Sequence, residues 1–435
     1  MIKNKVIKNA SWIIGCKIVQ SVITLIVSML TARYLGPSNY GIISYAASIV
    51  AFLVPVMQLG LNHVIVQETI RYPEDEGKIY GSALGVSLIG SVACILGIFT
   101  FVSFVNAGKT ETITVCVLYS LILACQAFEL IQYWYQAKYL SKYVSIVSLC
   151  AFVIVSAYKI FLLVTGKSIY WFSVSNAIDH LLIAVALLIL YRIKGGKPLC
   201  FSWTVTKRMV SVSRYYIVSS LMVTVFAQTD KIMLTLMVGD ASTGYYSAAV
   251  ACAGISSFVF SAIIDSARPA ILESKAVNTE IYEKNVSRLY CAVTYLSLAQ
   301  CIVMTVFASP LIMLLYGADY TPAVPALQLV VWYTTFSYYG SVRNVWILAE
   351  KKQKYLWIIN LVGALSNIIL NAFLIPGFGV LGAAFASLVT QIFTNVFIGF
   401  IIRPIRHSNL LMLKGLNPNI ILEFFRKKQS DGGNS

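Results

Sequence analysis

The chain is built from long apolar runs that alternate with short polar connections. Each run has about 20 residues, the length that an α-helix needs to cross the hydrocarbon core of a bilayer. Lipid offers no partner to backbone polar groups, so runs of this length favour helices over the shorter alternating strands of a barrel. The pattern predicts twelve transmembrane helices, near residues 11–33, 40–61, 81–105, 113–134, 144–164, 169–191, 214–238, 245–268, 290–309, 327–349, 355–375 and 380–402.

Composition agrees with an all-α integral membrane protein. Hydrophobic residues make up 58% of the 435 residues and charged residues 11%, whereas soluble domains average about half and about a quarter. The nine cysteines fall mostly within apolar runs without paired spacing, which argues against a disulfide framework or a zinc site. No P-loop, metal-ligand cluster or nucleophile–base pattern is visible, so we expect no enzyme, no metal and no cofactor.

Basic residues are concentrated on one side of the predicted membrane. The net charge is +16, and nearly all Lys and Arg outside the spans lie at the chain ends or after even-numbered spans. The opposite connections hold only Arg33, Lys109 and Lys167. The positive-inside rule therefore predicts that both termini are cytoplasmic. This placement explains the basic charge without a nucleic-acid partner, and the basic segment 403–435 is expected to lie on the anionic inner leaflet.

The long basic connection in the middle of the sequence predicts two halves of six spans each. The expected parts are a cytoplasmic N-terminus, a first bundle, a linker, a second bundle and a basic tail, at residues 1–10, 11–191, 192–213, 214–402 and 403–435. A shift of 203 residues superposes Gly36-x4-Gly41-x2-Ser44 on Gly239-x4-Gly244-x2-Ser247. With six spans per half, such repeats would be parallel, related by an axis along the membrane normal.

Two predicted spans carry a polar stripe along one helical face. In the first span the stripe consists of Lys17, Ser21, Thr24, Ser28 and Thr31, and in the seventh of Ser213, Tyr216, Ser220, Thr224, Gln228 and Lys231. Steps of three and four residues place each set on one face. The stripes predict that spans 1 and 7 line one central cavity. The alternatives are that Ser and Thr mark helix–helix contacts and that the lysines reach the interface.

Two arginines extend the set of candidate cations. Arg343 lies deep in the predicted span 327–349, after Phe336 and Tyr339. Its planar fork suits a phosphate, and aromatic neighbours could stack on the guanidinium or on a sugar. A structural ion pair with a carboxylate is the alternative. Arg33, at the external end of the first span, is either a second phosphate contact or an interfacial anchor.

Four carboxylates also fall within predicted spans: Glu129, Asp179, Asp230 and Asp265. Ionisable residues at this depth are costly, which makes each of them a functional candidate. Each could carry a coupling proton or neutralise a buried cation, and the sequence leaves both roles open. His180, beside Asp179, belongs either to such a site or to the core.

Several motifs occur in the order and positions of a known family. They are Arg33-Tyr-Leu-Gly36-Pro37 with Tyr40-Gly41, Asp230-Lys231-Ile-Met-Leu234, Gly244-Tyr-Tyr-Ser247, Pro310 with Leu315-Tyr316-Gly317 and Tyr320, and Pro376-x-Phe378-Gly379-x2-Gly382-Ala383-Ala384. On these residues the chain resembles the Wzx-type oligosaccharide flippases, in the polysaccharide-transport branch of the MOP exporter superfamily.

The resemblance implies a multi-pass protein of the bacterial inner membrane, with two six-helix bundles around a central cavity in a MATE-like fold. It implies alternating access and transfer of undecaprenyl-diphosphate-linked oligosaccharide repeat units to the external leaflet, for O-antigen or capsule synthesis. Polymerase and chain-length proteins of the same pathway are the implied partners, besides membrane lipid. Lys17, Lys231, Arg343 and Arg33 would then hold the diphosphate, because such a group needs cationic partners in a low-dielectric site.

Two other functions compete with this interpretation. A MATE-like drug or cation antiporter should present carboxylates to its substrate, whereas the stripes here carry lysine. A membrane glycosyl polymerase or ligase usually needs a large loop with acids or histidines. The predicted external loops are short, no DxD pair is present, and the three histidines are scattered.

Overall fold

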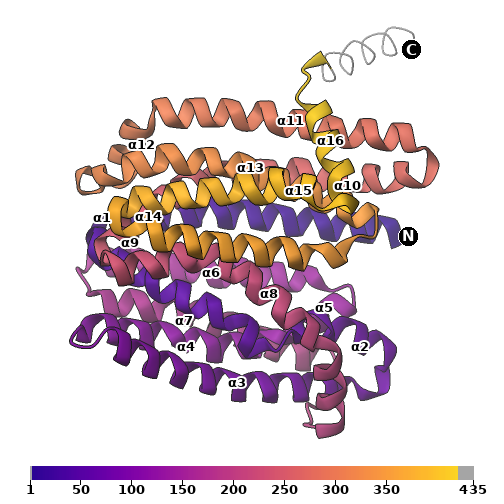
Figure 1. Ribbon diagram of the computed structural model, residues 1–435. Coiled ribbons are helices and arrows are strands. Elements are labelled where there is room, and N and C mark those ends of the chain that lie inside the picture. The colour runs from indigo at the N-terminus through magenta and orange to yellow at the C-terminus, as the bar shows by residue number, and fades with distance from the viewer. Residues whose placement is uncertain (1, 420–435) are drawn as a thin grey trace. The chain divides into compact units, whose positions relative to one another are not determined.

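The computed structural model describes residues 2–419, except for the side chains of residues 2–14, 17, 18, 215, 219 and 276. Within this part of the chain all regular elements are helices (Figure 1). The chain divides into two compact units, Met1–Gly244 and Tyr245–Ser435. The division into bundles 11–191 and 214–402 stays a prediction, and the end of the basic tail lies outside the described residues.

The first unit is a bundle of long helices joined by short turns. Its helices are α1 (Ile2–Gln58), α2 (Ile65–Arg71), α3 (Glu76–Val105), α4 (Thr110–Phe128), α5 (Gln132–Ala137), α6 (Ser141–Val164), α7 (Ile169–Ile193), α8 (Trp203–Met237) and the start of α9 (Asp240–Ala253), with 3-10 turns η1 (Leu61–His63), η2 (Pro73–Asp75) and η3 (Glu129–Ile131). α3, α4 and α7 lie side by side, and α8 packs against α1 (Figure 1).

The second unit has the same all-helical character. It contains the rest of α9, η4 (Gly254–Ser256), α10 (Ser257–Val277), α11 (Thr279–Val306), α12 (Ala308–Leu315), η5 (Ala318–Ala323), α13 (Val324–Ala349), η6 (Gln353–Tyr355), α14 (Leu356–Ile392), the π-helical segment η7 (Phe393–Phe397), α15 (Ile398–Ile401), η8 (Arg403–Ile405) and α16 (Arg406–Gly415). α11, α13 and α14 lie side by side (Figure 1).

Every predicted span overlaps a helix of the structure. The first two spans form α1, which breaks at Gly36 with φ 74°, and the last two form α14, which breaks at Gly379 with φ 53°. Glycine adopts positive φ without the penalty that a Cβ imposes, so both breaks lie where the sequence permits them. In each case the glycine turns one long helix into two consecutive spans.

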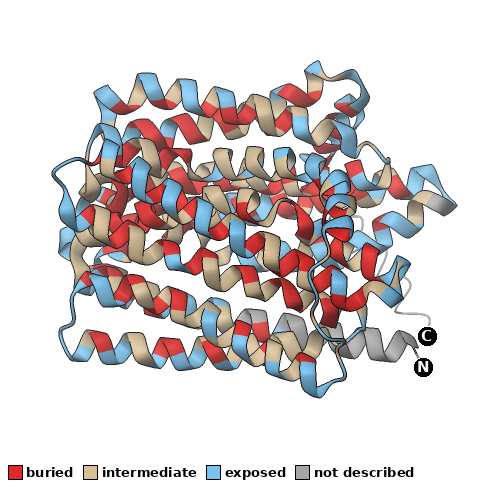
Figure 2. Ribbon diagram, turned by 90° about the horizontal axis from the view of Figure 1, so that it is seen from below, coloured by how far each residue is buried: buried red, intermediate tan, exposed pale blue. Residues whose placement is uncertain are grey.

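The surface of the helices is suited to lipid. Nine helical stretches of the described residues are long and apolar enough to cross a membrane. Figure 2 shows exposed residues along the outer faces of helices and buried residues between them. Ile89, Phe104 and Val164 are 69%, 87% and 82% exposed. In water such a surface would be costly, but lipid covers it without penalty, so the chain is a multi-pass membrane protein.

α13 is not among the nine stretches, although it corresponds to the predicted span 327–349. The helix carries several tyrosines and hydroxyl side chains together with Arg343, which lower its hydropathy. Half of its residues are buried within the second unit, among them Arg343, Tyr338 and Tyr339, so these polar groups face protein rather than lipid.

Candidate functional site

A cluster of half-buried polar side chains lies between helices of the first unit, within the predicted spans. α4 ends at Phe128 and continues as the 3-10 turn η3, which begins at Glu129. Gln126 and Glu129 therefore project to the same side, toward α7. α7 contributes Asp179 and His180, which are adjacent in sequence. Helices that pack along their length thus bring together side chains that are distant in sequence.

His180 is the centre of this cluster. Its Nδ1 lies 2.9 Å from Oε1 of Glu129, and its Nε2 lies 3.3 Å from Nε2 of Gln126. A neutral imidazole that donates from Nδ1 to the carboxylate can accept at Nε2 from the amide. Both ring nitrogens then have a partner. The structure thereby joins the predicted candidate Glu129 to a histidine that the sequence left undecided.

A second polar pair lies beside the first. Lys159 of α6 donates from Nζ to Oδ1 of Asn176 at 2.8 Å, and Asn176 in turn donates to the carbonyl of Phe172 at 3.1 Å. Asp179 interacts electrostatically with Lys159 and His180. Among the described residues no hydrogen bond reaches the buried Oδ1 of Asp179. The cluster therefore combines two carboxylates, one ammonium and one imidazole.

The predicted stripe of the first span is partly satisfied within α1 itself. Thr24 donates to the carbonyl of Gln20 at 2.7 Å, and the hydroxyl of Ser28 lies 3.2 Å from that of Tyr40. The side chain of Ser21 is exposed, whereas Thr31 Oγ1 is buried and has no hydrogen-bond partner in the described structure. The side chain of Lys17 lies outside the described residues.

The stripe of α8 faces α1 and η1. Gln228 accepts a hydrogen bond at 3.0 Å from Ser48, which belongs to the second predicted span rather than the first. Ser220 lies 3.5 Å from Nε2 of His63, and Thr224 donates to the carbonyl of Ser220 at 3.0 Å. The structure thus packs α8 against α1, while the predicted cavity between spans 1 and 7 stays a prediction.

The two charged residues near the end of α8 have different surroundings. Asp230 is buried, with 6% exposure. Lys231 is half-buried, and its ammonium forms no hydrogen bond or ion pair with the described residues. An ammonium in this position is available to an anion. Binding of a substrate phosphate by Lys231 stays a prediction.

Arg343 lies in the second unit and contacts the π-helical segment. It is 4% exposed, and it donates from Nη1 to the carbonyl of Thr394 at 2.6 Å and from Nη2 to Oδ1 of Asn395 at 2.9 Å. Its Nε has no hydrogen-bond partner in the described part of the chain. Asn395 also donates to Gln391 at 2.6 Å. The guanidinium therefore binds two residues of the π-helical segment. In such a segment the backbone hydrogen bonds run from i to i+5 and not from i to i+4 as in the flanking α-helix.

The other two predicted charges lie on the surface of their units. Arg33 is exposed at the end of the first half of α1. Asp265 pairs at 2.8 Å with Arg268, one turn along α10, and the side chains are 61% and 48% exposed. Among the described residues, Asp265 forms no hydrogen bond or ion pair with Arg343. The roles predicted for these residues stay predictions.

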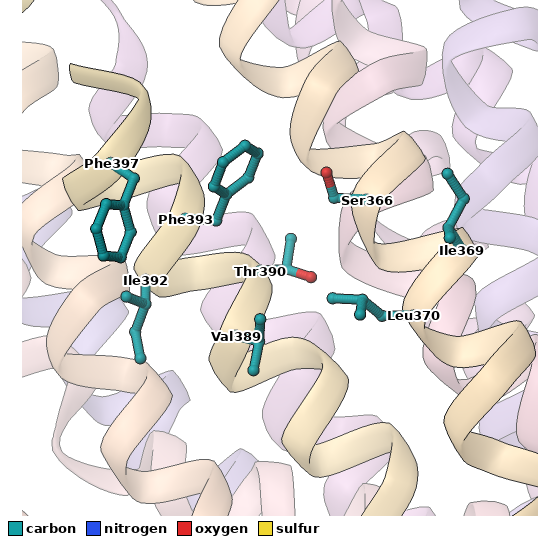
Figure 3. Close-up of a pocket in the computed structure, with 8 residues that line it drawn as sticks. All are labelled: Ser366, Ile369, Leu370, Val389, Thr390, Ile392, Phe393 and Phe397. Carbon is teal, nitrogen blue, oxygen red and sulfur yellow. The ribbon is translucent and has the colours of Figure 1, made fainter. Parts of the chain in front are cut away.

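An apolar cavity of about 500 Å³ lies beside the π-helical segment (Figure 3). It is lined by Ser366, Ile369, Leu370, Val389, Thr390, Ile392, Phe393 and Phe397, from both halves of α14 and from η7. The Thr390 hydroxyl donates to the carbonyl of Ala386 at 2.7 Å. The cavity thus offers mainly hydrocarbon and aromatic surface.

A protein family matches most of the chain. Residues 6–275 match the family described as "Polysaccharide biosynthesis protein". The chain belongs to this family. A curated relative of this polysaccharide biosynthesis protein is an uncharacterized membrane protein of Methanocaldococcus jannaschii, 25% identical over 301 residues. The match covers 59% of the chain and 57% of that protein, so it spans just over half of the relative's length.

Solved structures establish the fold of this family member. The lipid II flippase MurJ in an inward closed conformation superposes with a TM-score of 0.70 at 16% identity, covering 94% of this chain and 92% of that one. An inward-facing multidrug resistance MATE family transporter of the MOP superfamily gives 0.65 at 13% identity, with 90% and 95% covered. The predicted MATE-like, all-α membrane fold is therefore confirmed.

Sequence reasoning missed part of the polar cluster in this polysaccharide biosynthesis protein. It identified Glu129 and Asp179 but assigned no partner to Lys159, which hydrogen-bonds Asn176. The available signal was the spacing of Asn176, Asp179 and His180, which places polar atoms on neighbouring faces of one helix. Which faces of α4, α6 and α7 meet is a property of their packing, and a single sequence does not contain it.

Proposed function

We propose that the protein moves a lipid-linked oligosaccharide across the membrane, from the cytoplasmic to the external leaflet. The observation that carries the proposal is the family match over residues 6–275, in a chain with the fold of a lipid II flippase. A diphosphate and sugar hydroxyls cannot cross hydrocarbon unaided. A flippase supplies polar surface within the membrane while the lipid chain stays in the bilayer.

The cations of the predicted spans are the proposed ligands of the diphosphate. Lys231 is the strongest of these, since its ammonium is half-buried and forms no hydrogen bond or ion pair with the described residues, although the adjacent Asp230 acts on it electrostatically. Lys17 and Arg33 of the first span and Arg343 of α13 complete the proposed set. The hydroxyls of Ser21, Thr24 and Ser220 would contact sugar hydroxyl groups.

The finer parts of the proposal follow from charge placement and the family resemblance. We propose the inner membrane of a bacterium, cytoplasmic termini and two six-helix bundles that alternate access to a central cavity. The proposed substrate is an undecaprenyl-diphosphate-linked repeat unit of O-antigen or capsule, and the proposed partners are the pathway's polymerase and chain-length proteins. The protein would change the position of its substrate and leave its covalent structure intact.

A MATE-like antiporter is the second candidate, because a multidrug resistance MATE family transporter shares the fold with a TM-score of 0.65. A strain that lacks the gene separates the two. The flippase proposal predicts that completed, lipid-linked repeat units accumulate in the cytoplasmic leaflet, and that the wild-type gene restores their export. An unchanged lipid pool together with slower efflux of cationic drugs would support the antiporter.

A further inference from the structure

The polar cluster of the first unit places four ionisable side chains inside predicted spans: Glu129, Lys159, Asp179 and His180. They come from η3, α6 and α7, so the helices themselves hold the groups together. The four side chains are half-buried, and charges at membrane depth are costly unless they are compensated. The total charge of these four side chains therefore influences whether His180 binds a proton.

The charges balance when one proton is added. With a neutral His180, the cluster holds two carboxylates and one ammonium, which leaves a net charge of about −1 at neutral pH. A proton on His180 makes the cluster neutral. A site closed to water favours the neutral form, and entry of water favours release of the proton. The cluster would thus take up a proton when the surrounding helices close and release it when they open.

Gln126 can serve both protonation states of the imidazole. As described, its Nε2 faces Nε2 of His180 at 3.3 Å, which suits the neutral ring. Its Oε1 is buried with no hydrogen-bond partner in the described structure. When a proton adds to the lone pair of His180 Nε2, that nitrogen becomes a donor, and a half-turn of the amide presents Oε1 as its acceptor. Nδ1 keeps its contact with Glu129 in both states.

The surroundings favour a proton over a metal cation. The described residues contain no group of three or more His, Cys, Asp or Glu side chains arranged to hold a metal. Lys159 adds a positive charge beside Asp179, which would repel a second cation. The other titratable groups that act on Glu129 are Cys125 of α4 and Tyr133 of α5, and both are ordinarily neutral at physiological pH.

We propose that the Glu129–His180 pair, 2.9 Å apart, binds one exchangeable proton and that a proton gradient thereby drives transport. This inference rests on the proposed function, to which it adds the coupling ion. Together with Glu129, Lys159 and Asp179 give the cluster a net negative charge that a proton on His180 neutralises. Gln126 is a positioning residue that contacts the His180 ring in both protonation states.

The proton site is tested without any transport measurement. Full-length protein with isotope-labelled histidine is reconstituted in nanodiscs, and the ring nitrogens are followed by NMR as pH is lowered. The His180 signal is assigned by its loss in His180→Gln. We expect it to titrate and its midpoint to move to lower pH in Glu129→Gln, because the mutation removes the anionic partner. A His180 ring that does not titrate, or that titrates unchanged in Glu129→Gln, overturns the proposal.

Coupling is tested in proteoliposomes that contain a fluorescent undecaprenyl-diphosphate-linked oligosaccharide. A gradient of one pH unit should shift the leaflet distribution of this probe by up to about tenfold per coupled proton. His180→Gln should abolish the shift, whereas His407→Gln should preserve it. His407 is a matched control, since it pairs with Glu283 at the same 2.9 Å but lies on α16 beyond the spans. Flipping that ignores the gradient overturns the coupling and leaves the flippase intact.

Absence of flipping in every sample would overturn the proposed function instead. In that case the NMR titration still decides whether the Glu129–His180 pair binds a proton. The two failures are therefore distinguishable.

Discussion

Gly41 and Gly244 form one reciprocal backbone contact. A Cβ at Gly41 would overlap the carbonyl oxygen of Asp240 and lie 2.9 Å from the backbone nitrogen of Gly244, and a Cβ at Gly244 would overlap the carbonyl oxygen of Pro37. The 203-residue shift carries Pro37 onto Asp240 and Gly41 onto Gly244. The repeated motif thus packs against its own copy, and glycine is needed at both positions because the backbones touch.

The first prediction concerns this contact. Gly41→Leu should lower the free energy of unfolding by about 1–3 kcal/mol, because the added side chain forces the two backbones apart. Thermal unfolding of the purified protein in detergent measures the change. Gly97→Ala is the matched control: Gly97 also lies in a long helix, but a Cβ there meets no atom within 4 Å. Equal thermal stability of Gly41→Leu and wild type would show that the contact does not constrain the fold.

Arg343→Lys tests the geometry of the guanidinium separately from its charge. Lysine keeps the positive charge but cannot bind both the Thr394 carbonyl and the Asn395 side chain as the planar fork does. Loss of one charge-assisted hydrogen bond should cost about 1.5–3 kcal/mol of unfolding free energy. Denaturant or thermal unfolding gives the value.

The control for Arg343 is Arg268→Lys, in an exposed pair with Asp265. Pairs of this kind contribute about 0–1 kcal/mol, so stability should barely change. If Arg343→Lys is as stable as Arg268→Lys, the guanidinium does not hold the π-helical segment.

Lys231→Met should reduce transport of the lipid-linked oligosaccharide while the protein still folds. A charge-assisted contact of about 1.5–3 kcal/mol corresponds to roughly a tenfold to hundredfold loss. The Lys231 ammonium forms no hydrogen bond or ion pair with the described residues, so its removal should leave stability nearly unchanged. Lys207→Met, in an exposed position on the same helix, serves as the control. Normal transport by Lys231→Met would exclude this lysine from phosphate binding.

The ion pair between Lys275 and Glu350 predicts a pH dependence of stability. Burial alone would raise the pKa of Glu350, but the hydrogen bond and charge of Lys275, 2.5 Å away, hold the pKa of this carboxyl below its ordinary value. A depressed pKa contributes stability above the unfolded value of about 4.3, and this stability is lost as the pH falls through the folded value.

Glu350→Gln should therefore unfold more readily than wild type at neutral pH, and the difference should shrink in acid. Thermal unfolding of both proteins at a series of pH values measures this difference in stability. A difference that is constant across the series, or that grows in acid, would contradict the assigned role of the ion pair.

The sequence predicted the spans well because each span is a local property. Run length and apolar character specify a helix in lipid, and Gly36 and Gly379 mark the breaks between consecutive spans. The linker was less predictable. α8 begins at Trp203, and Cys200 donates from its backbone nitrogen to the carbonyl of Gly77 at 3.1 Å. Nothing in the composition of the linker indicates that it packs along α3.

The site was predictable only as a set of candidates. A helical stripe shows which residues share a face, but the partner of that face depends on how the helices pack. Gln228 contacts Ser48 of the second predicted span, and Arg343 contacts a carbonyl 51 residues further along the chain. A backbone carbonyl has no signature in the sequence, so a carboxylate was the only structural partner that could be anticipated for Arg343.

Transfer of a lipid-linked oligosaccharide between leaflets by the purified protein is the decisive test of the flippase proposal. Vesicles are prepared with a fluorescent undecaprenyl-diphosphate-linked oligosaccharide, and the fraction exposed outside is followed with a membrane-impermeant quencher. A flippase should make transfer much faster than in protein-free vesicles, and Lys231→Met should slow it at least about tenfold. Transfer no faster than in protein-free vesicles, combined with protein-dependent efflux of a cationic dye, would contradict the flippase proposal and identify an antiporter.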